Sequence, residues 1–233
     1  MPLYQIADLL VQMDPKYPTL TGRAAQYLTE RTDAPDFIIK PAPGYIAQMQ
    51  ESAPHLTPDQ CEYIRFGTLF YMYLLRHEGM MLHASAVVVD GRAYLFSASS
   101  GTGKSTHTSA WLELFGSRAY ILNDDKPALR FRDGVLCACG TPFSGKDDIS
   151  RNVSVPVAGI CMLGRGEENQ IAPLPVNEAL PLLYEQTQRY LLPKDGARML
   201  ELLTRVVTAV PLWRLRCTIG TDAARVAYEA MKQ

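Results

Sequence analysis

The sequence predicts an α/β protein with a mixed sheet and a small amino-terminal α+β extension. Three observations support this prediction. A strand pattern, a glycine-rich loop and a helical pattern follow one another over residues 93–115. Strand-like runs joined by Asp-Gly turns flank this unit, and the first 56 residues are repeatedly interrupted by proline. The order strand, loop, helix and strand is typical of an α/β unit, and the hairpins add antiparallel ribbons to it.

Length and charge exclude several classes of protein. The chain has 233 residues, of which 47% are hydrophobic. A chain of this size buries roughly 70% of its unfolded surface, so we expect one large globular unit or a core with an appendage. Lysine and arginine number 23 against 24 acids, a net charge of −1. We therefore expect neither a nucleic acid nor an anionic membrane as a partner.

The apolar runs and cysteines point to the cytoplasm. The longest apolar runs, 68–75 and 156–163, are far shorter than the ~18 residues that a membrane-spanning helix needs. The start MPLYQIADLL lacks the basic and apolar stretches of a secretion signal. Five cysteines in such a chain are typical of reduced thiols. We expect a cytoplasmic protein without a transmembrane segment.

A helix is predicted where the amino-terminal segment ends. Thr57 is suited to an N-cap and Pro58 to the first helical position, and apolar residues recur to about His77. We expect residues 1–78 to form the α+β extension, packed on a core of residues 79–233.

The core region shows alternating strand and helix patterns. Asp-Gly pairs at 90–91 and 133–134 predict two tight hairpins. The predicted strands are 80–89, 93–98, 118–123, 126–132, 135–140, 155–163 and 212–217, and the predicted helices are 103–115, 177–190, 195–210 and one from Thr221.

Residues 97–106, SASSGTGKST, carry the pattern of a phosphate-binding loop between a strand and a helix. Glycines let successive backbone N–H groups approach phosphate oxygens at a helix amino terminus. In this pattern the lysine contacts the β and γ phosphates and the next serine contacts magnesium. Ala98 stands where the usual pattern has its first glycine. The candidate nucleotide-binding residues are Ser99, Ser100, Gly101, Thr102, Gly103, Lys104, Ser105 and Thr106. The alternative is a helix start at which serine and glycine only cap.

Two adjacent carboxylates end the strand that follows, in YILNDD at 120–125. A metal bound to a triphosphate needs a carboxylate at the end of a neighbouring strand. Adjacent carboxylates repel unless a cation lies between them, so one of Asp124 and Asp125 could bind magnesium and the other accept a proton from an attacking hydroxyl. The alternative is a solvated turn before Lys126-Pro127.

The segment HASAVVVDGRAYLFSASSGTGKST, followed by ILNDD, resembles the catalytic domain of bacterial HPr kinase/phosphorylase, with kinship to ATP-dependent phosphoenolpyruvate carboxykinases and small serine kinases. The resemblance covers about residues 80–165. It implies a P-loop core of that superfamily that uses ATP and magnesium.

The same resemblance implies site roles. His83, on the strand before the hairpin, would lie beside the catalytic aspartate. Lys104 and both aspartates complete the candidate catalytic group, with Asp124 as the base and Asp125 as a magnesium ligand together with Ser105, although the two aspartates could be exchanged.

Further candidates follow the hairpins. In TPFSGK, at 141–146, Lys146 precedes Arg151, and the two could neutralise charge on a transferring phosphoryl group. The alternative is a solvated loop. We expect Cys137 and Cys139 to be buried thiols, and Thr106 and His107 to be exposed on their helix.

The predicted function is an ATP- and magnesium-dependent kinase that phosphorylates a hydroxyl on serine, on a peptide or protein, or on a small molecule. The alternative is an ATP-binding regulatory or accessory protein without catalysis, in modified-peptide biosynthesis for example. The substrate-loop signature of authentic HPr kinases is absent, which disfavours HPr as the substrate. HPr kinases form hexamers, but the resemblance does not extend to assembly, so both a monomer and a homo-oligomer are open alternatives.

Overall fold

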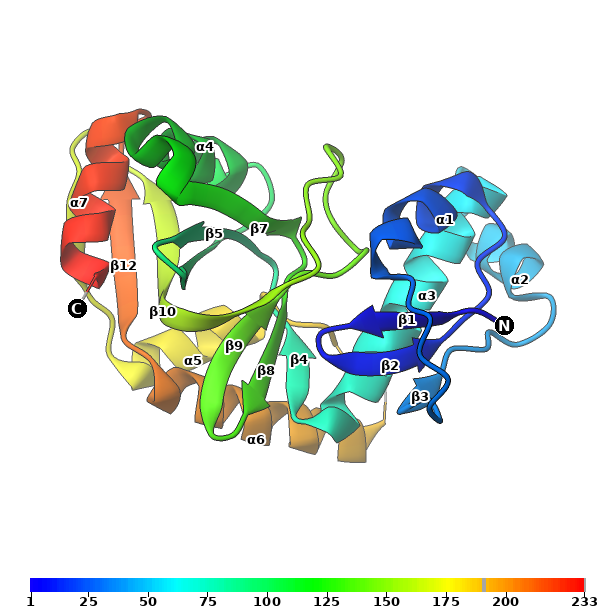
Figure 1. Ribbon diagram of the computed structural model, residues 1–233. Coiled ribbons are helices and arrows are strands. Elements are labelled where there is room, and N and C mark those ends of the chain that lie inside the picture. Colours follow the sequence, from blue (N-terminus) through cyan, green and yellow to red (C-terminus); the bar gives the residue numbers. More distant parts are fainter. Residues whose placement is uncertain (190–191, 233) are drawn as a thin grey trace.

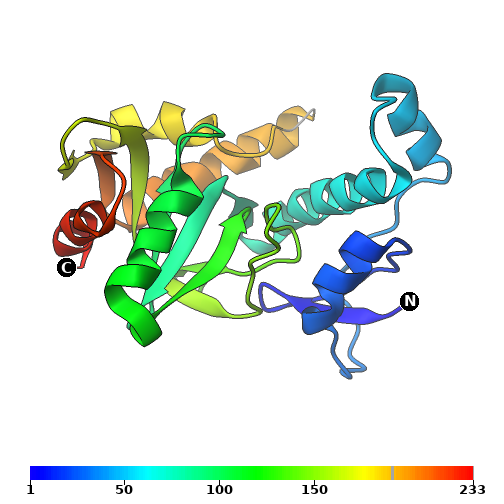
Figure 2. The same ribbon diagram turned by 90° about the horizontal axis from the view of Figure 1, so that it is seen from above.

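A computed structural model describes residues 1–189 and 192–232. Its larger part is built around a curled mixed sheet, and a smaller part lies to one side (Figure 1). We call residues 1–78 the amino-terminal lobe. In both views its first elements lie beside the main sheet, and its long last helix runs toward that sheet (Figure 2).

The amino-terminal lobe is a small sheet covered by helices. Its β1 and β2 are antiparallel, and β3 pairs with β2 in parallel. Thr57 and Gln60 form a reciprocal capping box at the last helix, and a 3-10 turn continues that helix to His77, which confirms the predicted start and end. The elements are β1 (Leu3–Ile6), β2 (Leu9–Gln12), α1 (Pro18–Ala24), β3 (Phe37–Ile38), α2 (Tyr45–Ser52) and α3 (Pro58–Leu74).

The hydrophobic core of the lobe continues into the larger part of the molecule. Phe70, on α3, packs in the same buried cluster as Cys137, Cys139 and Phe143. The two cysteines are buried free thiols, as predicted. The lobe is therefore packed on the remaining chain through a shared apolar core.

The main sheet runs in the order β4-β8-β9-β10-β6-β5-β7, with β12 beside β10 and β11 beside β12. Strand β10 is parallel to β6 and β12, and the other pairs are antiparallel, so the prediction of a mixed sheet is confirmed. The strands are β4 (Gly79–Met81), β5 (Ala84–Val89), β6 (Arg92–Ser97), β7 (Ala119–Asp125), β8 (Ala128–Arg132), β9 (Val135–Cys139), β10 (Ser154–Arg165), β11 (Gln170–Pro173) and β12 (Leu212–Cys217).

Both Asp-Gly pairs form the predicted hairpin turns. Their backbone φ angles are positive, 48° and 76° at Asp90 and Gly91 and 49° and 80° at Asp133 and Gly134. The strand expected over 80–89 is in fact two: β4 pairs with β8, while β5 pairs with β6 and β7. The break between them matters for the site, because it contains His83.

Helices cover both faces of the main sheet (Figure 1). One apolar cluster joins α4 (Lys104–Phe115) and α7 (Thr221–Met231) to one face, and another joins α5 (Val176–Tyr184) and α6 (Pro193–Ala209) to the opposite face. The helix predicted over 177–190 ends early, at Tyr184, and its predicted end at Tyr190 lies outside the described residues. Within the described part of the chain, no helix is long and apolar enough to cross a bilayer.

Candidate functional site

The glycine loop joins the end of β6 to the start of α4. Gly101 and Gly103 have φ angles of 78° and 116°, which side chains other than glycine rarely adopt. No side chain caps α4 at Gly103, so the first N–H groups of the helix have no partner from a cap. Ala98 has no positive φ and is buried, so alanine at the position of the missing glycine causes no backbone strain. The Thr102 amide donates to the Ser99 carbonyl within the loop. The other loop amides and the start of the helix form a place where an anion is electrostatically favoured.

Lys104 lies at the base of this loop. Its buried ammonium group donates to the carbonyl oxygens of Ala98, at 2.9 Å, and Ser99, at 3.4 Å. Burial lowers the pKa of Lys104, while the nearby Asp125 and Asp124 oppose this shift. The ammonium is thus held between the loop and the two carboxylates.

Ser105 and Asp124 contact each other directly. The Ser105 hydroxyl donates to the Asp124 carboxylate, with its Oγ 2.8 Å from Oδ2 and 3.1 Å from Oδ1. Asp124 is buried near the end of β7, opposite Ser85 on β5. The pair therefore places two hard oxygen ligands at the mouth of the loop.

Asp125 faces a different partner. Its Oδ1 lies 3.2 Å from His83 Nε2, and its Oδ2 pairs with the Lys126 ammonium. Burial opposes ionisation of this carboxyl, but the His83 and Lys126 contacts outweigh it and lower the pKa of Asp125 to about 2. Its φ of 110° lies in a region that non-glycine residues seldom adopt, and such backbone strain is concentrated at functional sites.

His83 lies one residue before β5 rather than on the strand, which corrects its predicted placement. The break in the strand lets its ring turn toward Asp125, and Gln186 fixes it from the other side. His83 Nδ1 lies 3.1 Å from Gln186 Oε1, and the His83 amide donates to the Gln186 carbonyl at 2.7 Å. The ring is therefore oriented by contacts at both nitrogens.

A cavity of about 480 Å³ joins most of the predicted residues. The loop, the two aspartates and Lys146 all contribute to its wall. Its lining is His83, Ser100, Gly101, Gly103, Lys104, Ser105, Thr106, Asp124, Asp125, Gly145, Lys146 and Asp147.

Three predicted residues lie outside this cavity. Ser99 is exposed at the start of the loop and contributes its carbonyl to Lys104. Thr102 lines a second cavity on the other side of the loop. Arg151 is drawn away, because its guanidinium stacks 4.4 Å from the centre of the Tyr120 ring. Arg151 therefore does not line the cavity that contains the other predicted phosphate-binding residues.

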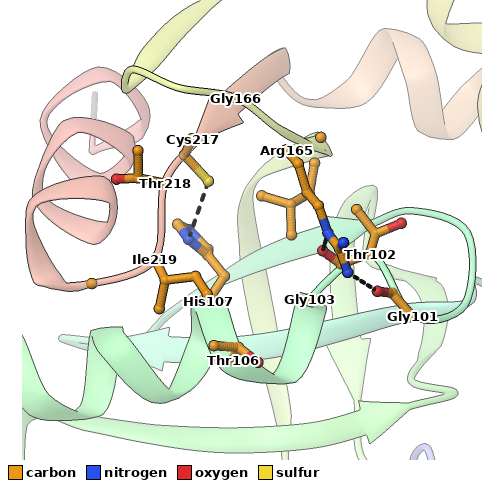
Figure 3. Close-up of a pocket in the computed structure, with 13 residues that line it drawn as sticks. Gly101, Thr102, Gly103, Thr106, His107, Arg165, Gly166, Cys217, Thr218 and Ile219 are labelled. Atoms are coloured by element: carbon orange, nitrogen blue, oxygen red, sulfur yellow. Dashed lines mark hydrogen bonds between the residues drawn. The ribbon is translucent and has the colours of Figure 1, made fainter.

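The second cavity, of about 470 Å³, lies between the glycine loop and the ends of β10 and β12 (Figure 3). Arg165 reaches across it and donates to the carbonyls of Gly101, at 2.7 Å, and Thr102, at 3.3 Å. The sequence pattern marks Arg165 only weakly, because this contact joins strand and loop residues that are distant along the chain. Arg165 holds the loop from the side opposite the carboxylates.

His107 is buried, so the expectation of an exposed histidine was wrong, whereas Thr106 is exposed as predicted. The helical period turns His107 toward the sheet, where its ring packs 4.4 Å from that of Phe96. Its Nε2 accepts a hydrogen bond from the Trp111 indole at 3.1 Å. Burial lowers the pKa of His107 to about 4, so the ring is neutral near pH 7.

The side chains present fit magnesium held together with a polyphosphate. Among residues 1–189 and 192–232, no cluster of three or more histidine, cysteine, aspartate or glutamate side chains is arranged to hold a metal. Magnesium typically takes only one or two protein oxygens, with phosphate and water supplying the others. Ser105 and Asp124 offer that donor set beside the N–H groups of the glycine loop.

The comparisons with known proteins give one family. No curated protein matches the chain. Among solved structures, the HPr(Ser) kinase/phosphatase from Coxiella burnetii matches with 12% identity and a TM-score of 0.36, over 65% of this chain and 92% of that one. A family model, described as SynChlorMet cassette protein ScmC, matches residues 59–222, which is more than half of the chain. The chain therefore belongs to the ScmC family.

Proposed function

We propose that this protein binds magnesium–ATP at the glycine loop and transfers the γ-phosphoryl group to a hydroxyl. The observation that carries the proposal is the separation of the two aspartates, one toward Ser105 and the other toward His83, within the cavity that contains Lys104. A cluster of ion pairs that only stabilised the fold would not require a glycine loop of the phosphate-binding type beside it. Residues 79–233 would then form a catalytic unit with a P-loop core, and residues 1–78 its extension.

The geometry favours exchanging the roles that the sequence first suggests for the aspartates. Asp124 accepts a hydrogen bond from the hydroxyl of Ser105, the residue that the loop pattern assigns to magnesium, so we assign Asp124 and Ser105 to magnesium. Asp125 contacts His83 and Lys126 instead, so we assign it to the acceptor hydroxyl. Magnesium–ATP, when bound, supplies the phosphoryl group and a divalent charge that neutralises it.

Each group of the chain then has a defined task. Backbone N–H groups of the loop and the Lys104 ammonium bind the phosphates. Asp125 orients the acceptor hydroxyl and takes its proton as the new oxygen–phosphorus bond forms, while the electron pair of the broken bond stays on the diphosphate. A carboxylate whose pKa is about 2 is a weak base. A weak base is sufficient for phosphoryl transfer through a loose transition state, in which the proton leaves the hydroxyl late. His83 stabilises the Asp125 carboxylate until that proton arrives.

The second cavity is suited to the nucleoside. It adjoins the loop on the side away from the carboxylates, so phosphates seated on the loop would direct the base and sugar between Arg165 and Ile219. Ile219 is 87% exposed and lines this cavity, so its side chain is open to contact with a bound base.

The alternative is an accessory protein that binds ATP without transferring phosphate. The description of the family as a cassette protein favours it, because the word suggests a group of proteins that act together in biosynthesis. The two proposals share the nucleotide site and differ only in the use made of Asp125.

Transfer of label from γ-labelled ATP separates the two proposals. We expect wild-type protein with magnesium to label serine or a serine-containing peptide, and Asp125→Asn to reduce the rate about 100-fold. Calorimetry on the same samples should show that Asp125→Asn still binds magnesium–ATP. Binding by the wild-type protein without transfer to serine, to serine peptides or to HPr would instead support the accessory protein.

A further inference from the structure

We propose that the groove between the amino-terminal lobe and the carboxylate pair binds the phosphoryl acceptor, and that this acceptor is a peptide segment with a bulky apolar residue beside its hydroxyl. The inference rests on the kinase function proposed above and adds the location and chemical class of the second substrate.

The groove has a volume of about 530 Å³ and opens to solvent. One wall comes from α1 and the start of α3, and the other comes from residues 125–126 and 144–146. Asp125, Gly145 and Lys146 line both this groove and the cavity beside the glycine loop. A hydroxyl that enters through the groove therefore reaches the Asp125 carboxylate on the side facing the phosphate site.

The lobe is fixed against the loop that carries Lys146. The Ser144 carbonyl accepts hydrogen bonds from Tyr63 Oη at 2.6 Å and Arg23 Nη1 at 2.9 Å. Arg23 also pairs with Asp148 at 3.3 Å, and its side chain is largely buried. These contacts make the groove wall a preformed surface, which reduces the entropy cost of binding.

The free polar groups of the groove are mainly donors. Asp59 uses its carboxylate to cap α1, accepting from the amide of Thr19 at 3.0 Å and also from its hydroxyl. Asp125 already contacts His83 and Lys126, and its remaining lone pairs are those proposed to accept from the acceptor hydroxyl. Lys146, by contrast, has no ion-pair partner in the described part of the chain. A ligand that offers several acceptor oxygens, as the carbonyls of a peptide do, complements this arrangement.

A smaller apolar pocket of about 130 Å³ branches from the groove. It shares Tyr63, Ile64 and Lys126 with the groove, and Met81 and Phe143 are among its other walls. A pocket of this size accommodates one apolar side chain. Its position beside Lys126, the residue after Asp125, places that side chain next to the reacting hydroxyl.

The dimensions favour a peptide over a free amino acid. Pockets of roughly 300–1,000 Å³ hold ligands of several residues' size and bury most of their surface. Free serine would leave most of the groove filled with water and the apolar pocket vacant. An extended segment of a few residues fills both, with main-chain oxygens toward Lys146 and one side chain against Tyr63 and Phe143.

The test compares the phosphorylation of several acceptors by the wild-type protein and by a variant of the groove. The acceptors are short peptides with serine next to phenylalanine or leucine, the same peptides with glycine in that place, and free serine, each with γ-labelled ATP and magnesium. Ile64 is 42% exposed and lines both the groove and the apolar pocket, so Ile64→Glu places a charge there. Leu200→Glu is the matched control, because Leu200 is a helical residue, 45% exposed, on α6.

We expect the apolar-flanked peptide to be phosphorylated with a kcat/KM at least tenfold above that of the glycine-flanked one. Ile64→Glu should reduce that advantage about tenfold, and Leu200→Glu should not. Equal rates for all acceptors, or no effect of Ile64→Glu, would overturn the groove assignment while leaving the kinase proposal standing. Calorimetry separates a failure of the groove assignment from a failure of the kinase proposal, because a wild-type protein that does not bind magnesium–ATP contradicts the proposed function itself.

Discussion

The Ser105 hydroxyl donates a hydrogen bond to the Asp124 carboxylate, with 2.8 Å between Oγ and Oδ2. Ser105 lies at the start of α4 and Asp124 near the end of β7. The hydrogen bond therefore joins the helix that follows the glycine loop to the main sheet. In the proposed site these two oxygens would supply two of the six ligands of an octahedral magnesium ion, and phosphate and water would supply the others.

Magnesium should therefore strengthen nucleotide binding through this pair. We expect Ser105→Ala and Asp124→Asn each to reduce the gain in ADP affinity caused by magnesium about tenfold, or roughly 1.4 kcal/mol. Isothermal calorimetry with magnesium and with EDTA measures that gain. Ser109→Ala is the control, because its exposed hydroxyl is on the same helix and donates to the Ser105 carbonyl. An unchanged magnesium effect in both site variants would remove the metal assignment.

Acid should destabilise the protein through Asp125. Its folded-state pKa of about 2 lies below the ordinary value of 3.8. The resulting stability is present above pH 4 and is lost as the pH falls toward 2, because the unfolded chain takes up the proton first. We expect a loss of up to about 2 kcal/mol over this interval. Urea unfolding of wild type and Asp125→Asn at several pH values measures it, and parallel pH curves for the two proteins would contradict the ion pair.

His107 should change the free energy of unfolding in a different pH range. Its folded-state pKa of about 4 lies below the ordinary 6.5, so the folded protein resists the proton that the unfolded chain accepts. The free energy of unfolding should fall by up to about 3 kcal/mol between pH 6.5 and pH 4. His107→Gln should remove this part of the pH dependence. A wild-type stability that stays constant between these pH values would show that His107 is accessible to protons.

Gly140 should tolerate no side chain. A Cβ at this position would lie 1.8 Å from the carbonyl oxygen of Arg151, and backbone cannot move aside cheaply. We expect Gly140→Ala to lower the free energy of unfolding by about 3 kcal/mol or more. Gly196→Ala is the matched control, since nothing lies within 4 Å of its Cβ inside α6, and it should stabilise the protein by up to about 1 kcal/mol. Similar chemical-denaturation midpoints for both variants would contradict the close approach.

Local sequence patterns predicted the elements that depend on local chemistry. The Asp90-Gly91 turn follows from positive φ angles that few residue types tolerate, and the start of α3 follows from the Thr57 cap. The strand β4 was not separated from β5, because its end is set by pairing with β8 rather than by a turn signal. The short β11 was missed for the same reason, since it depends on β12.

The candidate site was predictable only where its residues are close in sequence or carried by the family resemblance. The loop, Lys104 and the aspartates were predicted from local motifs and His83 from the resemblance, and the structure brings them together around one cavity. Tyr63 and Arg23 act through contacts with residues 81 and 121 positions away, so no local pattern marks them, and Arg165 is marked only weakly for the same reason. Arg151 stacks on Tyr120 and does not line that cavity, and this contact depends on the folded chain.

The most direct measurement is calorimetric titration of magnesium–ATP into wild type, Lys104→Ala and Lys40→Ala. On the proposal that the loop and its buried lysine bind phosphate, wild type and Lys40→Ala, which changes an exposed lysine in the amino-terminal lobe, should bind alike. Lys104→Ala should bind at least about tenfold more weakly, because it loses the buried ammonium at the base of the loop. Equal binding by all three proteins, or none by wild type, would contradict the account.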